Sequence, residues 1–199
     1  MGRTGGFDFY ENTLVPAHTA GAGVDDSYLV NGAAESGSTL TVDGGTAALK
    51  DGDVFTIAGV FMVHPETRQS TGVLQQFVVT ADYAGGAGDI SISPPITASG
   101  AYQTVSNVPA DNAAITFVGT ASTAFQQSLA FHKSAFTFAT ADLVLPQGVD
   151  FASRQSYDGI SLRIIRQYDI NTDAFPCRVD ILYGSASLYP QLATRVANN

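Results

Sequence analysis

The side chains that most often carry chemistry in proteins are few and scattered in this sequence. Histidine occurs three times, at His18, His64 and His132, and none of the three lies at the spacing of a metal site. The single cysteine, Cys177, excludes an intrachain disulfide, and its place at the start of a predicted strand favours a buried small hydrophobe over a nucleophile. We therefore predict structural or exposed roles for these four residues and no metal.

Two acidic pairs and a glycine-rich loop are the remaining candidates for a site. Asp25 with Asp26 and Asp51 with Asp53 carry possible calcium ligands, but neither pair lies in an EF-hand loop, and aspartate beside glycine at a strand end is typical of a turn. Residues 83–88 read YAGGAG and lack the lysine and the strand-to-helix context of a phosphate-binding loop. No catalytic triad can be assembled, so we predict neither enzyme activity nor a cofactor.

Charged side chains make up only 14% of the chain, yet both signs crowd one stretch near its C-terminal end. Residues 161–168 and 177–183 are rich in β-branched and aromatic residues, and the polar run 169–173 separates them, which predicts two strands joined by a turn. Such crowding favours a surface that meets a complementary surface, although a solvated face shows the same pattern. The subunit contacts predicted on this ribbon are Arg163, Arg166, Arg178, Asp169 and Asp180.

Length and composition limit the partners of the chain. At 199 residues it has room for one domain, or one domain and part of another, and its 45% hydrophobic residues with 20 glycines describe an ordered, turn-rich protein. Nine basic against 18 acidic residues give a net charge of −9, which argues against sequence-specific binding of nucleic acid. No apolar run is long enough to span a bilayer or to form a signal peptide, so we expect no membrane partner.

The middle of the chain is a succession of short strand signals separated by Gly, Pro and Asp. Strands at spacings of about 8 to 12 residues indicate an antiparallel barrel or sandwich. The segment 54–61 is apolar almost throughout, which predicts a central strand buried on both faces, and Gly59 permits either close approach of another backbone or a bulge. The predicted strands of this region are residues 39–42, 54–63, 74–81, 90–93, 102–105 and 115–118.

The segments on either side of this region have a different character. The sequence AGAG at residues 20–23 and a second small-residue stretch at 119–122 are predicted to be flexible joints, with the flanking segments adjacent in space. Beyond the second joint, we expect residues 128–134 to form a short helix that leads into a strand. Residues 149–158 are predicted to be a polar connection to the charged ribbon.

Five pieces of the sequence, in this order, resemble consecutive parts of the major coat proteins of tailed bacteriophages, in the short-tailed branch whose subunit carries an extra β-rich domain. The pieces are FDFYENTLVPAHT at 7–19, GDVFTIAGVFMVHPETRQSTGVLQQ at 52–76, residues 111–119, LAFHKSAF at 129–136 and the ribbon at 160–196. The resemblance implies a mainly β fold with minor helix content. It consists of an antiparallel β-barrel of telokin-like, immunoglobulin type, inserted into the Hong Kong-type capsid fold, together with C-terminal β-ribbon segments of that fold.

The same resemblance implies the organisation of the chain. Residues 1–22 correspond to a capsid-core segment, residues 23–124 to the inserted barrel, and residues 125–199 to the return into the core. The chain is then the C-terminal part of a coat protein. We further expect the glycine-rich loop from Tyr83 to Asp89 to protrude and to touch a neighbouring subunit.

The function implied is that of a structural subunit of a phage or prophage icosahedral capsid, which acts by self-assembly. Such a subunit forms homo-oligomeric capsomers and a shell, is assembled in the host bacterial cytoplasm, resides in the virion, and has scaffolding and portal proteins as further partners. The alternative is a non-catalytic β-sandwich of a phage tail or adhesin that binds carbohydrate. The eight tyrosines permit this alternative, whereas the absence of tryptophan, the usual sugar-stacking side chain, counts against it.

Overall fold

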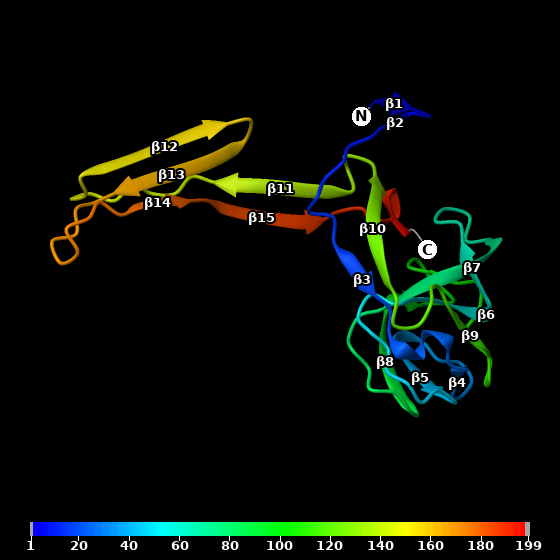
Figure 1. The fold of residues 1–199 in the computed structure, drawn as a ribbon. Helices are drawn as coiled ribbons and strands as arrows, with labels where there is room; N and C mark the ends of the chain where they lie inside the picture. Colours follow the sequence, from blue (N-terminus) through cyan, green and yellow to red (C-terminus); the bar gives the residue numbers. More distant parts are fainter. Residues whose placement is uncertain (1, 198–199) are drawn as a thin grey trace. The chain divides into compact units, whose positions relative to one another are not determined.

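The structure is a computed structural model that describes residues 2–197 of the chain (Figure 1). Within these residues the regular structure is β-strand apart from two 3-10 helices, η1 (Ala22–Asp25) and η2 (Pro190–Leu192). The chain divides into two compact units. We call Leu129–Val196 the arm unit and the residues up to Ser128 the barrel unit. The prediction of a mainly β fold is confirmed.

The barrel unit contains a six-stranded antiparallel sheet that curls back on itself. Its order is β4 (Leu29–Val30), β5 (Gly37–Asp43), β8 (Gly88–Ile96), β7 (Ser70–Val79), β6 (Val54–Val63) and β9 (Ile115–Phe117). The two ends of this order meet, since the Val30 amide donates to the Ala113 carbonyl at 3.0 Å and the Ile115 amide donates to the Tyr28 carbonyl at 3.1 Å. This near closure confirms the predicted antiparallel barrel. Residues 102–105, predicted as a strand, contribute only the isolated bridge of Val105 to Met62.

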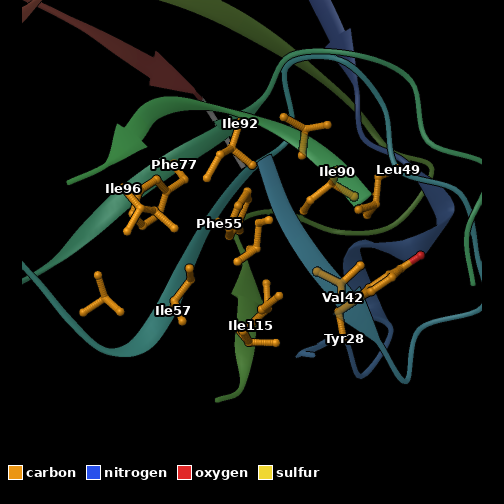
Figure 2. Close-up of a cluster of buried hydrophobic side chains, with 14 of the residues drawn as sticks. Tyr28, Val42, Leu49, Phe55, Ile57, Phe77, Ile90, Ile92, Ile96 and Ile115 are labelled. Carbon is orange, nitrogen blue, oxygen red and sulfur yellow. The ribbon is translucent and has the colours of Figure 1, made fainter. Parts of the chain in front are cut away.

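The interior of the barrel is a single apolar core (Figure 2). Side chains alternate between the two faces of a strand, so every second residue of these strands points inward. Phe55 and Phe77 stack at the centre of the core with their ring centroids 5.7 Å apart. The other core residues are Tyr28, Val30, Leu40, Val42, Leu49, Ile57, Val60, Val79, Ile90, Ile92, Ile96, Val105 and Ile115. The barrel therefore buries a core made entirely of its own residues.

Strand β6 differs from its prediction in two respects and agrees with it in a third. Burial on both faces is wrong: Phe55 and Ile57 are buried, whereas Ala58 is exposed, because a barrel has only one interior. In the sheet order β6 also lies next to the edge strand β9 and not at the centre. The predicted bulge is confirmed, since Gly59 has a φ of +79° and the pairing with β7 is irregular there.

The chain enters and leaves the barrel through two paired strands, which we call the stem: β3 (Ala17–Thr19) and the first residues of β10 (Ala124–Phe131). They pair antiparallel, with His18 opposite Phe125, and the Ala20 amide donates to the Thr123 carbonyl at 3.0 Å. The predicted adjacency of the flanking segments is thereby confirmed. The division into 1–22, 23–124 and 125–199 stays a prediction.

The prediction of a flexible joint at residues 20–23 is wrong. Gly21 and Gly23 are packed against the barrel so closely that a Cβ atom on Gly21 would lie 2.6 Å from the Ala48 carbonyl oxygen. A Cβ atom on Gly23 would lie 2.5 Å from the carbonyl oxygen of Ala47. The glycines permit close approach of two backbones here and do not provide flexibility.

The arm unit contains one two-stranded and one three-stranded sheet (Figure 1). Strand β11 (Phe136–Ala141) pairs with β15 (Leu182–Ser187), and β12 (Phe151–Tyr157), β13 (Ile160–Arg166) and β14 (Cys177–Asp180) form a three-stranded sheet. A further sheet has the order β16 (Ala193–Ala197), β10, β3.

Near the N-terminus, β1 (Arg3–Thr4) and β2 (Phe7–Asp8) form a short hairpin.

The predicted ribbon is confirmed as strands β13 and β14, joined across the polar turn, with Arg163 opposite Asp180, but its second strand ends at Asp180, and residues 182–183 belong to β15. Two other expectations for this region are wrong. The polar connection at 149–158 contains strand β12, because Asp158 and Gly159 form a tight turn that folds it onto β13. The helix expected at 128–134 is instead the end of β10 and a turn, in which the His132 amide donates to the Leu192 carbonyl at 2.9 Å.

Candidate functional site

The arm unit has almost no interior. Of its residues only Ala135 and Ser161 are buried, so its strands are joined by backbone pairing while most of their apolar side chains stay open to solvent. The large apolar residues exposed on it are Leu129, Phe131, Phe136, Phe138, Val144, Leu145, Phe151, Tyr157, Ile160, Leu162, Tyr168, Ile170, Phe175, Val179, Ile181, Leu182, Tyr183, Leu188, Tyr189, Leu192 and Val196. Extensive exposed apolar surface of this kind marks protein–protein contacts.

A shallow, mostly apolar groove lies on the ribbon of β11 and β15. It is lined by Phe136, Thr137 and Phe138 of β11 and by residues 185–187 of β15, which pair with them. Phe138 stacks on Tyr183 with ring centroids 5.8 Å apart, although the two residues are 54% and 63% exposed. Aromatic rings that are held in place and yet open to solvent can bind another apolar surface at little further cost in side-chain entropy.

Three of the five predicted charged residues meet on β13 and β14. Arg163 donates from Nη2 and Nε to Asp180 Oδ2 at 2.6 and 3.2 Å, and Arg178 Nε lies 2.9 Å from Asp180 Oδ1. The hydrogen bond from Arg163, followed by that from Arg178, holds the pKa of Asp180 below its usual range. Arg163 and Asp180 are largely covered, whereas the Arg178 side chain is 71% exposed. Arg178 is therefore the member of this cluster that can reach a partner.

The other two predicted residues lie at the loop between β13 and β14. The Arg166 guanidinium is 5.7 Å from the centroid of the Phe175 ring. The Phe175 ring also contacts the Tyr168 ring, with the two ring centroids 5.1 Å apart. Asp169 accepts hydrogen bonds from the Asn171 amide at 3.0 Å and from the Thr172 hydroxyl at 2.9 Å, and the first of these is the main cause of its lowered pKa. Asp169 shapes the loop, and Arg166 with the aromatic rings forms its surface.

The loop from Tyr83 to Asp89 does not protrude, contrary to expectation. Tyr83 is half-buried against the core, and its backbone exchanges hydrogen bonds of 2.9 and 3.0 Å with Leu49. The Gly86 amide donates to the Gly45 carbonyl at 3.0 Å, so the loop lies along the neighbouring segment. Asp89 is exposed on β8, opposite Thr41. Contact of Tyr83 and Asp89 with a neighbouring subunit stays a prediction.

Cys177 is open to solvent, whereas His64 and His132 accept hydrogen bonds from nearby backbone amides. Cys177 is exposed, so its predicted burial is wrong, because the ribbon that carries it has no interior. His64 Nδ1 accepts a hydrogen bond from the Glu66 amide at 3.2 Å, and His132 Nδ1 accepts one from the Ser134 amide at 3.2 Å.

In the described part of the chain no helix is long and apolar enough to cross a membrane.

One polar centre escaped sequence reasoning. The Asp53 carboxyl group is buried in the barrel unit, 2.9 Å from His18 Nε2, and it accepts hydrogen bonds from the Gly21 and Lys50 amides. In sequence Asp53 belongs to an Asp-Gly-Asp run that is typical of a turn, and the turn is indeed present, since the Asp53 amide donates to the Lys50 carbonyl. Nothing local in the sequence indicates that two of its three partners, His18 and Gly21, lie more than thirty residues away.

Comparison with known proteins places these observations in a family. The family model described as P22 coat protein - gene protein 5 matches residues 21–195. Among solved structures, the CUS-3 coat protein I-domain is 31% identical over 47% of this chain and 96% of its own, with a TM-score of 0.34. None of the curated proteins matches the chain. Because the family model covers the barrel and nearly all of the arm, the chain belongs to the P22 coat protein family and is a structural subunit of a phage capsid.

Proposed function

We propose that the arm unit supplies the contacts through which this coat subunit joins its shell, and that the protein acts by association with further copies and not by catalysis. The observation that carries the proposal is the contrast in burial. The barrel encloses fifteen core residues of its own, whereas the arm buries only Ala135 and Ser161. An isolated two-stranded pair such as β11 with β15 is only marginally stable in water, so this part of the arm needs a covering surface that the barrel does not need.

The charges of the arm fit a role in setting register. Exposed ion pairs add little affinity, but they exclude misaligned partners. Arg163 and Asp180 hold β13 against β14, and the Arg178 guanidinium, which is also paired with Asp180, remains largely exposed. In this proposal the apolar groove supplies contact area, and Arg178 and Arg166 align the contact.

The proposal extends to the rest of the subunit. Residues 1–22 and 125–199 belong to the capsid core in it, and residues 23–124 form the inserted barrel. The pairing of His18 with Phe125 supports this arrangement, because it brings the two flanking segments together at one side of the barrel. Assembly in the host cytoplasm, with scaffolding and portal proteins as partners, is part of the same proposal and rests on the resemblance to tailed-phage coat proteins.

Reversal of one exposed charge tests the contact directly. Arg178→Glu in the coat subunit should leave the barrel folded and reduce the yield of closed shells, because a carboxylate would face groups that the guanidinium complements. We expect a decrease of about tenfold, measured by sucrose-gradient sedimentation and electron microscopy. Arg178→Lys, which keeps the charge, is the matched control and should retain most of the yield. Shells of normal yield and size from Arg178→Glu would remove Arg178 from the interface.

A further inference from the structure

The strands that connect the barrel with the rest of the chain are held at a buried carboxyl group. Asp53 is 2% exposed and stands at the turn that precedes β6. Its Oδ1 is 2.9 Å from His18 Nε2, and its Oδ2 accepts from the Gly21 amide at 3.1 Å and from the Lys50 amide at 2.8 Å. One side chain of the barrel thus binds strand β3, the linker that follows it, and its own turn.

The stem has a second, apolar anchor. His18 and Phe125 lie directly opposite each other in the antiparallel pair, and such residues project to the same face of a sheet. The Phe125 side chain is buried in a small cluster with Ala20 and Val24, and Phe117 of the barrel packs against this cluster. The face of the stem that points to the barrel is therefore fixed at one polar and one apolar position.

The linker between these anchors leaves no free space. The Gly23 amide donates to the Ala48 carbonyl at 2.8 Å, and neither Gly21 nor Gly23 has room for a Cβ atom. A buried amide without an acceptor is costly, so the Gly21 amide needs the Asp53 carboxylate as its acceptor. The same carboxylate also holds His18 in place. The polar anchor should consequently close or open as a unit.

We propose that Asp53 is a latch that holds the stem in one orientation on the barrel, and that opening this latch converts a rigid mount into a hinge. With the latch closed, a displacement of the barrel is transmitted to β3 and β10. With it open, the stem is held by the Phe125 cluster, by the backbone pairing of β3 with β10 and by the Gly23–Ala48 hydrogen bond of the linker, and it can rotate about them. This inference concerns how the barrel is mounted, and it is independent of which surface makes the subunit contacts.

Hydrogen exchange of the full chain, followed by mass spectrometry, tests the latch in the variant Asp53→Asn. The amide nitrogen of asparagine would face the backbone donors of Gly21 or Lys50, and so the polar anchor should open. We expect about tenfold faster exchange in peptides that cover residues 17–25 and 121–127, with unchanged exchange in β8. Equal acceleration in the stem and in β8, or no acceleration in either, would overturn the proposal.

Two further variants make the result specific. His18→Ala removes the side chain that contacts Asp53 Oδ1 on the partly exposed side of the latch, so it should accelerate the same stem peptides to a smaller extent and should decide the matter if Asp53→Asn does not fold. Asp51→Asn makes the same chemical change two residues away on an exposed side chain, and it should leave the stem unchanged. A stem that is unaffected by His18→Ala, or loosened as much by Asp51→Asn as by Asp53→Asn, contradicts the latch.

Discussion

Phe55→Ala should lower the free energy of unfolding of the barrel by about 3–5 kcal/mol, which is the usual cost of removing a buried aromatic ring. Phe55 is fully buried, and its ring centroid is 5.7 Å from that of Phe77 and 5.4 Å from that of Phe117. A domain of this size is stable by about 5–15 kcal/mol in total, so the variant should be close to unfolding at 37 °C. Urea unfolding, followed by far-ultraviolet circular dichroism, measures the change.

The matched control for this experiment is Phe138→Ala. It removes the same atoms from a residue of the arm that is 54% exposed, and we expect a change in the unfolding of the barrel of less than about 0.5 kcal/mol. Similar losses from the two substitutions would mean that the arm belongs to the cooperative unit of the barrel. That result would contradict a barrel that is stable through its own core.

Phe138→Asp should nearly abolish shell formation while the barrel remains folded. A carboxylate at the centre of the β11–β15 groove would have to lose its hydration when a partner surface covers it, and a buried unpaired charge costs several kcal/mol for each contact. Because a shell repeats the contact many times, we expect the yield of particles to decrease by about 100-fold or more. Electron microscopy and sedimentation of the particles formed by the variant coat subunit measure this yield.

A conservative substitution controls for the loss of the ring alone. Phe138→Leu keeps an apolar side chain in the groove and should retain assembly with a modest decrease. The unfolding curve of the barrel should be the same for Phe138→Asp and Phe138→Leu, since the barrel core contains no residue of the arm. Normal particles from Phe138→Asp would show that this groove stays open in the shell.

The barrel and the charged ribbon could be predicted because their signals are local. Alternating apolar residues identify a strand, and Gly, Pro and Asp between strands identify turns. Strand β12 was missed although Asp158-Gly159 is a strong hairpin signal, because its residues are mostly polar. The stretch at 20–23 was misjudged for a different reason: the glycines that make a chain flexible also permit close packing, and the contacts with Ala47, Ala48 and Asp53 that distinguish the two are not local.

The candidate surfaces were predicted in part. Crowded charges indicated the ribbon, but sequence could not show that Arg163 and Asp180 face each other while Arg178 remains in solvent, since this depends on the register of β13 against β14. The apolar face of β11 was not predicted as a surface. Phe136 and Phe138 lie on either side of Thr137 as in any half-buried strand, and only the structure shows that both stay exposed although Phe131 and Tyr183 of the arm contact them.

Hydrogen exchange of the arm, compared between the isolated chain and the assembled shell, tests the central claim most directly. In the isolated chain we expect slow exchange in β5, β6, β7 and β8, and exchange in residues 129–196 within about 100-fold of an unfolded chain. In the shell, the peptides of β11, β13 and β15 should become protected while those of the barrel change little. An arm that is as protected in the isolated chain as in the shell would contradict the account.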